Sequence, residues 1–180
     1  MLRDRGYRRH GRDLYRPDCA PCHECQVLRI ELEHFRPNRN QRRVFKKGSQ
    51  AFSYRIQAPE FTPEKLALYQ RYLAFQHDRG PASPAPDGSQ QAAQMNEHSY
   101  REFFVDSFLG SDTCELQIFA ENQQLVGVAI LDRAGDALSA VYFYFAPEVA
   151  QLSPGTFAIL LEIELAREWG LRWFYPGFFI

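Results

Sequence analysis

The sequence lacks long apolar runs and several motifs by which common enzyme classes are identified. No stretch approaches about 18 consecutive apolar residues, so we expect no membrane span. The first ten residues, MLRDRGYRRH, contain arginines but no apolar core, so we expect no secretory signal and a cytoplasmic protein. A glycine-rich phosphate loop, G-x-S-x-G and H-E-x-x-H are all absent, which argues against P-loop enzymes, α/β-hydrolases and the usual zinc proteases.

Cysteine is scarce, yet three of the four cysteines lie close together. Cys19, Cys22 and Cys25 follow a strict three-residue spacing within YRPDCAPCHECQVLR. In a cytosolic chain such spacing indicates a metal or redox site more often than a disulfide framework. Three thiolates with a fourth ligand can bind zinc, and they also suit an iron–sulfur cluster, whereas buried structural cysteines are the alternative. The candidates for the fourth ligand are Cys114, His10, His23 and His34.

The net charge of −1 conceals two halves of opposite sign. Residues 1–50 carry 13 Lys and Arg against 6 Asp and Glu, whereas residues 51–180 carry 8 against 16. A segregated basic segment is the usual electrostatic footprint of a nucleic-acid partner. The alternative is a solvated basic face that has no partner.

Two arginine clusters account for the basic character of the N-terminal segment. The first lies beside Tyr7 and Tyr15, and the second is the stretch FRPNRNQRRVFKKG. Guanidinium groups bind phosphates through paired hydrogen bonds, and aromatic rings stack on unpaired bases. We therefore expect the partner to be a single-stranded nucleic-acid end. The candidate contact residues are Arg8, Arg9, Arg16, Arg42 and Arg43.

The chain divides into a basic, cysteine-bearing segment, residues 1–50, and a main domain, residues 51–180. Within the first part, VLRIELEHF alternates well enough to predict a strand. In the main domain, TPEKLALYQRYLAFQH predicts an amphipathic helix that begins after Thr62, with Pro63 at its first position. The following stretch is rich in Pro, Gly, Ser and Gln and predicts a flexible loop near residues 79–94, and SYREFFVDSFL predicts another short helix.

The second half of the chain predicts three strands, a helix and a last strand. CELQIFA and QQLVGVAILD form a hairpin, and ALSAVYFYFAPE follows, with Ser139, Val141, Phe143 and Phe145 on one face and Ala140, Tyr142 and Tyr144 on the other. SPGTFAILLEIELAREWG then predicts a helix capped by Ser153 and ended by Gly170. In the last strand, LRWFYPGFFI, Pro176 requires an edge position or a bulge. This order predicts an α+β fold and is typical of GNAT-type acyltransferases.

Glu162 is the unusual carboxylate of this helix. Its neighbours one turn away are Ala158, Ala166, Ile159 and Leu165, so it lies on an apolar stripe. A carboxylate in such a place is either paired or has a raised pKa, and a raised pKa suits a general base. A purely structural, paired glutamate is the alternative.

The start of the same helix is a second feature that carries chemistry. A helix that begins directly after a strand presents free N–H groups, which can bind an anion or a carbonyl oxygen. The turn SPGT, however, lacks the run of glycines by which GNAT enzymes usually hold the pyrophosphate of acetyl-CoA. The sequence therefore argues against an N-acetyltransferase that depends on CoA.

These stretches together resemble a known family, the arginyl- and leucyl-tRNA–protein transferases. The resemblance implies a GNAT-like catalytic half that transfers Leu or Arg from aminoacyl-tRNA to a protein N-terminus and so marks the protein for degradation. It implies tRNA and protein substrates rather than DNA or membrane, with acidic N-termini preferred in the bacterial branch. No cofactor is required for transfer, although family cysteines are linked to an iron–sulfur cluster in eukaryotic relatives. The matching stretches are GYRRHGRDLYRPDCAPCHEC, FRPNRNQRRV, LYQRYLAFQH, LSAVYFYFAPE, SPGTFAILLEIELAREWG and FYPGFFI.

The reaction that the resemblance implies suggests roles for named residues. The N-terminal amine attacks the ester carbonyl, so the protein must position two substrates and stabilise an oxyanion. The backbone N–H groups at Ser153, Gly155 and Thr156 are candidate donors. Glu162 is the candidate base, and Tyr142, Tyr144 or Tyr175 can hydrogen-bond the ribose or relay a proton. We expect the acidic acceptor to be recognised by Arg8, Arg9 or Arg43, and the tRNA to contact the other arginines, Arg16 and Arg42 among them.

Three departures from the family pattern leave alternatives open. The family usually has a further segment upstream and another strand downstream, and a larger apolar residue stands where this chain has Pro176. We therefore expect a shortened member of the family. The alternatives are a non-catalytic relative that binds metal and tRNA, and, less favoured, a CoA-dependent N-acetyltransferase. Whether Leu or Arg is the donor is left open.

Overall fold

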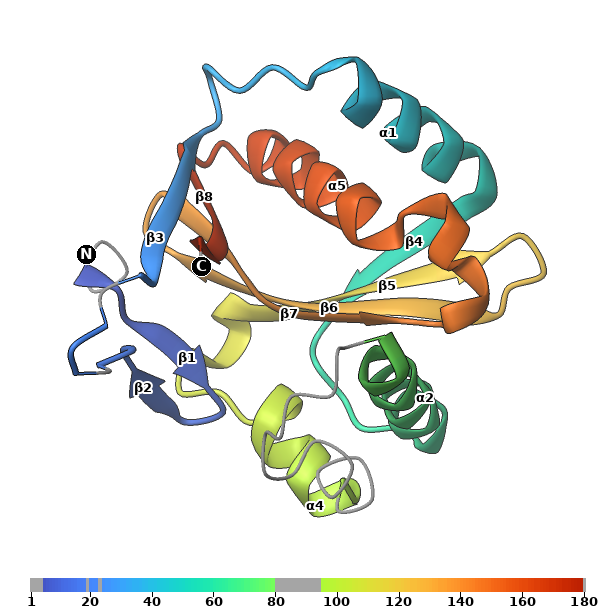
Figure 1. Cartoon of the computed structure of the whole chain (residues 1–180), viewed down its shortest axis with the longest axis horizontal. Coiled ribbons are helices and arrows are strands. Elements are labelled where there is room, and N and C mark those ends of the chain that lie inside the picture. The colour runs from blue at the N-terminus through green and yellow to red at the C-terminus, as the bar shows by residue number, and fades with distance from the viewer. Residues whose placement is uncertain (1–4, 19, 23, 80–94, 180) are drawn as a thin grey trace.

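The computed structural model describes residues 5–18, 20–22, 24–79 and 95–179, which build a six-stranded mixed sheet with helices on both faces (Figure 1). The strand order is β3-β8-β7-β6-β5-β4, and a separate hairpin, β1–β2, lies outside the sheet. Helices α1 and α5 cover one face, and α2 lies against the other. The strands are β1 (Arg8–His10), β2 (Asp13–Tyr15), β3 (Gln26–Glu31), β4 (Phe52–Gln57), β5 (Thr113–Ala120), β6 (Leu125–Ala134), β7 (Ala137–Phe145) and β8 (Trp173–Phe179); the α-helices are α1 (Arg39–Ala51), α2 (Pro63–Arg79), α4 (Glu97–Tyr100) and α5 (Pro154–Glu168).

The predicted α+β class and the GNAT-like order of strand, helix and strand are confirmed. β7 and β8 run parallel on either side of α5 in sequence, and all other neighbouring strands pair antiparallel. The helix predicted after Thr62 is also confirmed, since the Thr62 hydroxyl accepts a hydrogen bond from the Lys65 amide at 3.2 Å. The short helix predicted around SYREFFVDSFL is found, but it begins at Glu97 and passes after Tyr100 into a π-helix over Arg101–Val105.

Four elements were not predicted from the sequence, namely the strands β1 and β2 of the N-terminal hairpin, the helix α1 and the strand β4. The basic stretch that contains Arg42 and Arg43 is the helix α1, and it begins with a complete capping box. The Asn38 side chain accepts from the Gln41 amide at 3.0 Å, and the Gln41 side chain accepts from the Asn38 amide at 2.7 Å. The predicted boundary at residue 50 falls at the end of α1, although β3 and α1 already belong to the main sheet and its core.

β7 and β8 form a fork in the sheet. Among the described residues, they pair over Ala137–Ser139 and Trp173–Tyr175 and not beyond. The expectation for Pro176 is confirmed, because the register between β3 and β8 shifts there: Leu28 pairs with Gly177, whereas Ile30 pairs with Phe174. The fork therefore opens where proline and a bulge end regular pairing.

The prediction of strict alternation along β7 is wrong. The register with β6 shifts between Ala140 and Tyr142, which leaves Val141 as an extra residue. Ser139 and Val141 border a pocket beneath the β1–β2 hairpin, whereas the rings of Tyr142 and Tyr144 contact Tyr69 of α2. A bulge of this kind re-aims the side chains that follow it.

The two ends of α5 differ in how well they were predicted. Gly170 has the expected left-handed conformation, with φ of +69°, and follows the C-cap residue Trp169. Ser153 precedes the helix as predicted, but it also has positive φ, 56°, and its side chain caps no backbone N–H. The predicted loop around 79–94 lies almost wholly outside the described residues. None of the described helices combines the length and the apolar character that crossing a bilayer requires.

Candidate active site at the fork of the sheet

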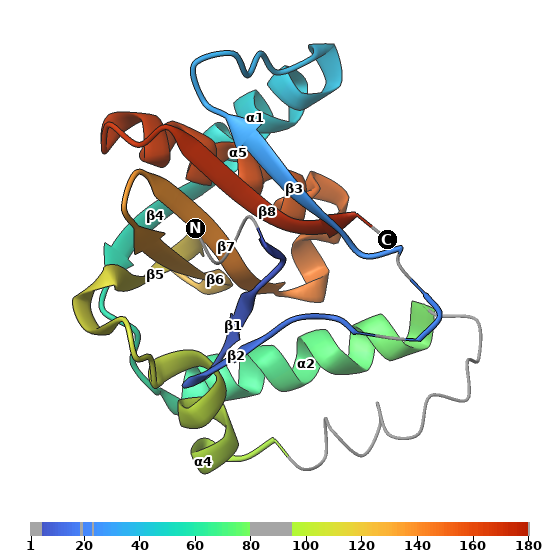
Figure 2. The same ribbon diagram turned by 90° about the vertical axis from the view of Figure 1, so that its left-hand side faces the viewer.

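Arg8 occupies the point at which β7 and β8 separate. Its side chain comes from β1, which lies beside β7 (Figure 2), and its Nη2 donates a hydrogen bond of 2.5 Å to the Ala140 carbonyl oxygen. Its guanidinium carbon lies 5.7 Å from the centre of the Phe178 ring of β8. The residue is only 9% exposed. The N-terminal hairpin therefore places a positive charge in the fork, next to the bulge in β7.

Arg9 anchors the hairpin to the sheet. Its Nε donates to Asp132 Oδ2 at 2.8 Å, and both side chains are 2% exposed. Thr113 donates to the other oxygen of Asp132 at 2.9 Å. Arg9 Nη1 donates to the Gly11 carbonyl at 3.1 Å, whereas Arg9 Nη2 is buried and has no hydrogen-bond partner. Such a desolvated pair holds the hairpin in place, because losing one partner would leave the other charge buried.

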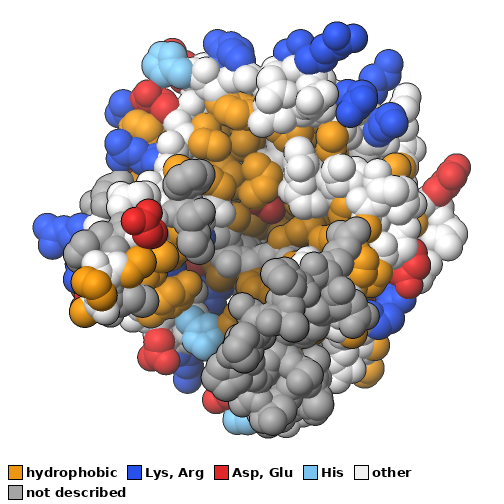
Figure 3. Space-filling view, viewed as in Figure 1, with side chains coloured by type: hydrophobic (Ala, Val, Ile, Leu, Met, Phe, Trp, Pro, Cys, Tyr) orange, Lys and Arg blue, Asp and Glu red, His pale blue; other side chains and the backbone are white. Residues whose placement is uncertain are grey.

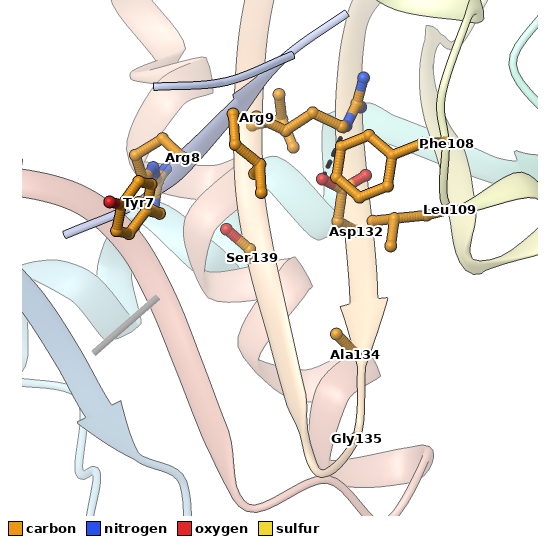
Figure 4. A pocket seen from close by; sticks show the side chains of 11 residues that line it. Tyr7, Arg8, Arg9, Phe108, Leu109, Asp132, Ala134, Gly135 and Ser139 are labelled. Carbon is orange, nitrogen blue, oxygen red and sulfur yellow. Dashed lines mark hydrogen bonds and ion pairs between the residues drawn. The ribbon is translucent and has the colours of Figure 1, made fainter. Parts of the chain in front are cut away.

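A pocket of about 220 Å³ lies beneath the hairpin (Figure 4). Arg8 and Arg9 line it from β1, and Asp132 and Ser139 line it from the main sheet. Its remaining walls are mostly apolar. They come from Tyr7, Leu14, Phe108, Leu109, Ala134, Gly135 and Val141. Of the other predicted arginines nearby, Arg16 is exposed and packs on the Tyr7 ring at 5.6 Å.

The N-terminus of α5 follows the far end of β7, after a 3₁₀ turn over Pro147–Leu152. Ser153 and Thr156 are exposed, and a Cβ added to Gly155 would meet no atom within 4 Å. The N-terminus of α5 is therefore accessible, and a carbonyl oxygen or a phosphate could reach its backbone N–H groups. Figure 3 shows a hollow with largely hydrophobic walls in the region of α5, β7 and β8.

Glu162 is buried on the opposite side of the sheet from Tyr142. It is 1% exposed, its Oε2 has no hydrogen-bond partner, and burial raises its pKa to about 8. Its charge acts on Cys114 of β5, whose thiol pKa is raised to about 11, chiefly by burial. The carboxyl group is thus protonated at neutral pH, and it is not within reach of solvent in this structure.

The candidate tyrosines do not gather around Glu162. The Tyr142 hydroxyl lies 3.5 Å from that of Tyr69 on α2, and burial raises its pKa. Tyr144 and Tyr100 share a buried hydrogen bond of 2.6 Å, and burial raises both pKa values. Tyr175, 1% exposed, pairs in register with Ser139. The hydroxyls of Tyr142 and Tyr144 therefore remain protonated near neutral pH, so they can donate hydrogen bonds but are poor bases.

A buried ion pair between α2 and β5 was missed in the sequence. Lys65 Nζ lies 2.6 Å from Glu115 Oε1, and the two side chains are 2% and 1% exposed. Gln117 donates to the same oxygen at 2.6 Å, while Glu115 Oε2 has no partner. The available signal was a single acidic residue inside the apolar strand CELQIFA. The pair fixes α2 against the sheet beside the tyrosines.

Helix α1 presents an exposed basic surface. It carries five exposed cations and no acidic residue, and Figure 3 shows basic side chains gathered over it. Arg42 donates a hydrogen bond of 2.5 Å to the Pro37 carbonyl oxygen. Because a carbonyl group is neutral, this contact does not neutralise the positive charge of Arg42. We call this set the α1 cations: Arg39, Arg42, Arg43, Lys46 and Lys47.

The cysteine motif is only partly described. Cys22 is exposed and Cys25 half-buried, and neither is in a disulfide, whereas Cys19 and the possible ligand His23 lie outside the described residues. Among the remaining residues, no three His, Cys, Asp or Glu side chains come together as a metal-ligand set. His34 contacts Glu31 at 3.0 Å, His10 packs on Phe103, and Cys114 belongs to β5. The predicted metal site therefore stays a prediction.

Comparison with known proteins finds similarity to the tRNA–protein transferases over almost the whole chain. The family model described as "Arginine-tRNA-protein transferase, N terminus" matches residues 1–43, and its C-terminal counterpart matches residues 64–180. A protein from Hahella chejuensis named aspartate/glutamate leucyltransferase is 33% identical over 175 residues, which cover 97% of this chain and 69% of that protein. A protein of the same name from Alkalilimnicola ehrlichii is 37% identical over 178 residues, with 97% and 68% covered.

Two solved structures share the fold at low sequence identity. L-PGS from Bacillus licheniformis superposes with a TM-score of 0.58 at 12% identity, covering 98% of this chain and 48% of that one. FemX gives a TM-score of 0.53 at 10% identity, with 98% and 58% covered. At these identities the similarity concerns the fold alone.

Proposed function

Since the chain belongs to the arginine-tRNA-protein transferase family, we propose that it transfers leucine from aminoacyl-tRNA to proteins that begin with Asp or Glu, so marking them for degradation. The observation that carries this proposal is the match over both the arginine-bearing N-terminus and the sheet. Leucine is favoured over arginine as the donor by the names of the similar proteins. A cytoplasmic location, where tRNA is charged, forms part of the proposal.

The chemistry demands little beyond positioning. The neutral N-terminal amine attacks the carbonyl carbon of the ester that joins leucine to the tRNA ribose. An amide bond forms, the ester C–O bond breaks, the amine loses a proton, and the ribose hydroxyl gains one. An α-amine has a pKa of about 7.7–8.0, so a fair fraction of it is already nucleophilic at neutral pH. The protein must therefore bring the two substrates together and stabilise the oxyanion.

The fork and the start of α5 are the proposed place of reaction. The open N–H groups around Gly155 and Thr156 are suited to hold the ester carbonyl or the terminal phosphate. Tyr142 and Tyr175, whose strands form the fork, are the proposed hydrogen-bond donors toward the ribose. Arg8 adds positive charge at the apex of the fork, close to the Ala140 carbonyl.

Glu162 is the proposed proton acceptor in those molecules in which its carboxyl group is ionised, which are a minority at neutral pH because its pKa is raised to about 8. A pKa of about 8 matches that of the attacking ammonium, so proton transfer between them is close to balanced in free energy. Since Glu162 is 1% exposed, the proton must reach it through a substrate bound in the fork or through an intervening group. A pH–rate profile of E162Q tests this role, because the variant removes the titrating group and keeps its shape.

The α1 cations are the proposed tRNA contact surface. Arg42 and Arg43 were expected to bind substrate, and both are exposed on α1, on the same side of the sheet as α5. The absence of acidic residues within α1 leaves its positive charge free to attract phosphates. Of the arginines near the N-terminus, Arg16 is exposed and remains a proposed tRNA contact.

Metal binding by Cys19, Cys22 and Cys25 is a separate proposal. Soft thiolate ligands suit zinc or an iron–sulfur cluster, which would brace the segment between β2 and β3. We expect the transfer itself to require neither metal centre, because the reaction changes no oxidation state and an ester can react with an amine without a Lewis acid. Metal analysis of the purified protein, with a triple Cys→Ser variant as the control, tests the proposal directly.

A transfer assay tests the proposed function. The protein is mixed with radiolabelled Leu-tRNA or Arg-tRNA and with peptides that begin with Asp, Glu or Ala. We expect label from Leu-tRNA on the Asp and Glu peptides and none on the Ala peptide. Binding of tRNA without transfer from either donor would favour the non-catalytic alternative. A thermal shift with acetyl-CoA but none with tRNA would favour the acetyltransferase.

A further inference from the structure

A small pocket lies between α1 and α5, the two helices that cover the same face of the sheet (Figure 1). Its volume is about 130 Å³. The helices touch where α1 has Gly48, because a Cβ at that position would collide with the Phe157 ring. One turn nearer the start of α1, Phe45 lines the pocket together with Leu160 of α5. The pocket therefore opens where larger side chains stand between the two helices.

Apolar side chains form the floor of this pocket, and charged ones form its rim. Leu160 is 5% exposed, and Pro37 and Phe45 are half-buried. Two exposed α1 cations and one half-buried carboxylate complete the lining. These are Arg42, Lys46 and Glu164. Such a pocket suits a ligand that is flat and apolar on its faces, polar at its edge and joined to negative charge.

Arg42 and Phe45 supply groups on which an unpaired nucleobase stacks. Arg42 donates to the Pro37 carbonyl oxygen at 2.5 Å, and both residues line the pocket, so this bond fixes the guanidinium at the rim. Unpaired bases stack on aromatic rings and on guanidinium planes. Lys46 lies one turn after Arg42 and lines the same pocket, where its charge can bind a phosphate. The pocket therefore offers a partner for the base and another for the backbone of one nucleotide.

Glu164 determines which base is favoured. Its Oε1 accepts a hydrogen bond from Arg167 Nη1 at 2.7 Å, but an ionised carboxylate has about four acceptor positions. It can therefore accept a further hydrogen bond from an exocyclic amino group, as carboxylates do with cytosine. Uracil has a carbonyl oxygen where cytosine has this amino group, and the negative charge of a carboxylate repels that oxygen. The pocket therefore favours cytosine over uracil.

The pocket lies within reach of the proposed place of reaction at the start of α5. An α-helix rises about 1.5 Å per residue, so Leu160 and Glu164 lie about 8 Å and about 14 Å along the axis from Gly155. Stacked nucleotides of one strand lie about 3.4 Å apart, so two to four of them span this distance. The end of tRNA that carries the amino acid is an unpaired strand of about this length, and its sequence is CCA.

We infer that the pocket between α1 and α5 seats a cytosine base of the unpaired CCA end of tRNA, and this inference rests on the proposed function. The base lies against Phe45 and the Arg42 guanidinium, and its amino group donates to Glu164. Lys46 and the other α1 cations contact the flanking phosphates. The terminal ribose, with its amino acid, then lies at the start of α5.

A change at Glu164 gives a test in which general electrostatics and the base pocket predict opposite results. The probe is a fluorescent RNA hairpin that copies a tRNA acceptor stem and ends in CCA. Loss of a carboxylate should strengthen the binding of RNA if only net charge matters. We expect E164A instead to weaken binding about fivefold, because the base loses its hydrogen-bond acceptor. E168A is the matched control, because Glu168 is exposed on the same helix and does not line the pocket.

A second hairpin, which ends in UUA, tests the choice of base without any variant. The natural protein should bind the CCA hairpin at least threefold more tightly than the UUA hairpin, and E164A should bind the two equally. E168A should keep the preference for CCA and bind that hairpin within twofold of the natural protein or more tightly. Fluorescence anisotropy at one fixed salt concentration measures all of these affinities.

The outcomes separate this inference from the proposed function, because binding is measured without transfer. Equal affinity of the natural protein for the two hairpins overturns the inference, and so does an E164A variant that binds the CCA hairpin as tightly as E168A does. Neither result affects the assignment of transferase activity. If both expected differences are found but the natural protein transfers no leucine, the inference stands and the proposed function fails. If the natural protein does not bind the CCA hairpin, the inference is overturned.

Discussion

The two arginine clusters of the N-terminal quarter have the same appearance in sequence and opposite roles in the structure. Arg8 and Arg9 are buried against the sheet, where they hold the hairpin and face a pocket. The α1 cations are exposed on a helix that has no acidic residue. Burial, rather than charge density, therefore distinguishes the two clusters, and we propose that only the exposed one attracts a polyanion. A substitution of Arg9 should therefore change the stability of the fold, whereas substitutions of the α1 cations should change the affinity for tRNA.

Removing Arg9 should have the largest effect. R9A leaves the Asp132 carboxylate buried without its partner, so we expect the free energy of unfolding to fall by about 3–5 kcal/mol. Denaturation in urea measures the change. The double variant R9M/D132L removes both charges and should recover most of the loss. A loss below about 1 kcal/mol for R9A would show that the pair is not desolvated in solution.

Glu162 should produce a pH-dependent effect of a few kcal/mol. Its pKa rises from 4.5 to about 8 on folding, so between these values the native state holds a proton that the unfolded state releases. The stabilisation is complete below pH 4.5 and is lost as the pH rises through 8, at about 1.4 kcal/mol per pH unit. We therefore expect E162Q to gain stability relative to the natural protein between pH 5 and pH 9.

The matched control for Glu162 is on the same helix. Glu164 is 46% exposed and paired with Arg167, so the stability of E164Q relative to the natural protein should change far less over that pH range. Unfolding curves at four or five pH values measure both variants. A stability difference for E162Q that does not vary with pH would mean that Glu162 titrates normally.

The α1 cations should affect tRNA binding and leave stability alone. R42A/R43A removes two exposed charges, so we expect tRNA affinity to fall about tenfold, or about 1.4 kcal/mol. The slope of log affinity against log salt should decrease by up to about 1.8 for contacts with double-stranded phosphates. Fluorescence anisotropy with labelled tRNA at several salt concentrations measures both. Unchanged binding would move the tRNA surface away from α1.

The smallest effect is expected at Arg71. It is exposed and lies 2.9 Å from Glu148, a surface ion pair that contributes at most about 1 kcal/mol. R71A should change neither tRNA affinity nor the transfer rate by more than about twofold. It serves as the control for loss of a positive charge outside α1. A large loss of tRNA affinity would show that net charge, rather than the position of α1, governs binding.

Periodic elements were the part of the fold that the sequence predicted well. The helices α2 and α5 and the strands β5, β6 and β7 follow regular apolar patterns bounded by Pro, Gly and turn residues, and each was found where it was expected. Helix α1 was missed because its arginines suggested a binding cluster, although Asn38 and Gln41 form a capping box at the expected spacing. Strand β4, which directly follows α1, carried no break that would separate the two.

The candidate site was predicted less completely, because it depends on contacts between distant segments. The bulge at Val141 shifts the side chains of β7, and no local pattern predicts it. Arg9 was expected to bind substrate, yet its partner Asp132 lies 123 residues away in sequence. Glu162 was correctly placed on an apolar stripe, but the tyrosines proposed to act with it lie elsewhere. The roles of all these residues remain predictions.

The most direct test compares the leucine transfer rate of R42E/R43E with that of the natural protein at low and at saturating Leu-tRNA, with an Asp peptide as acceptor. If α1 binds tRNA and the fork performs the reaction, the variant is slow at low Leu-tRNA and regains most of its rate at saturation. A rate that stays low at saturation would place these arginines in the reaction itself. A rate unaffected at low Leu-tRNA, or no transfer by the natural protein, would contradict the account.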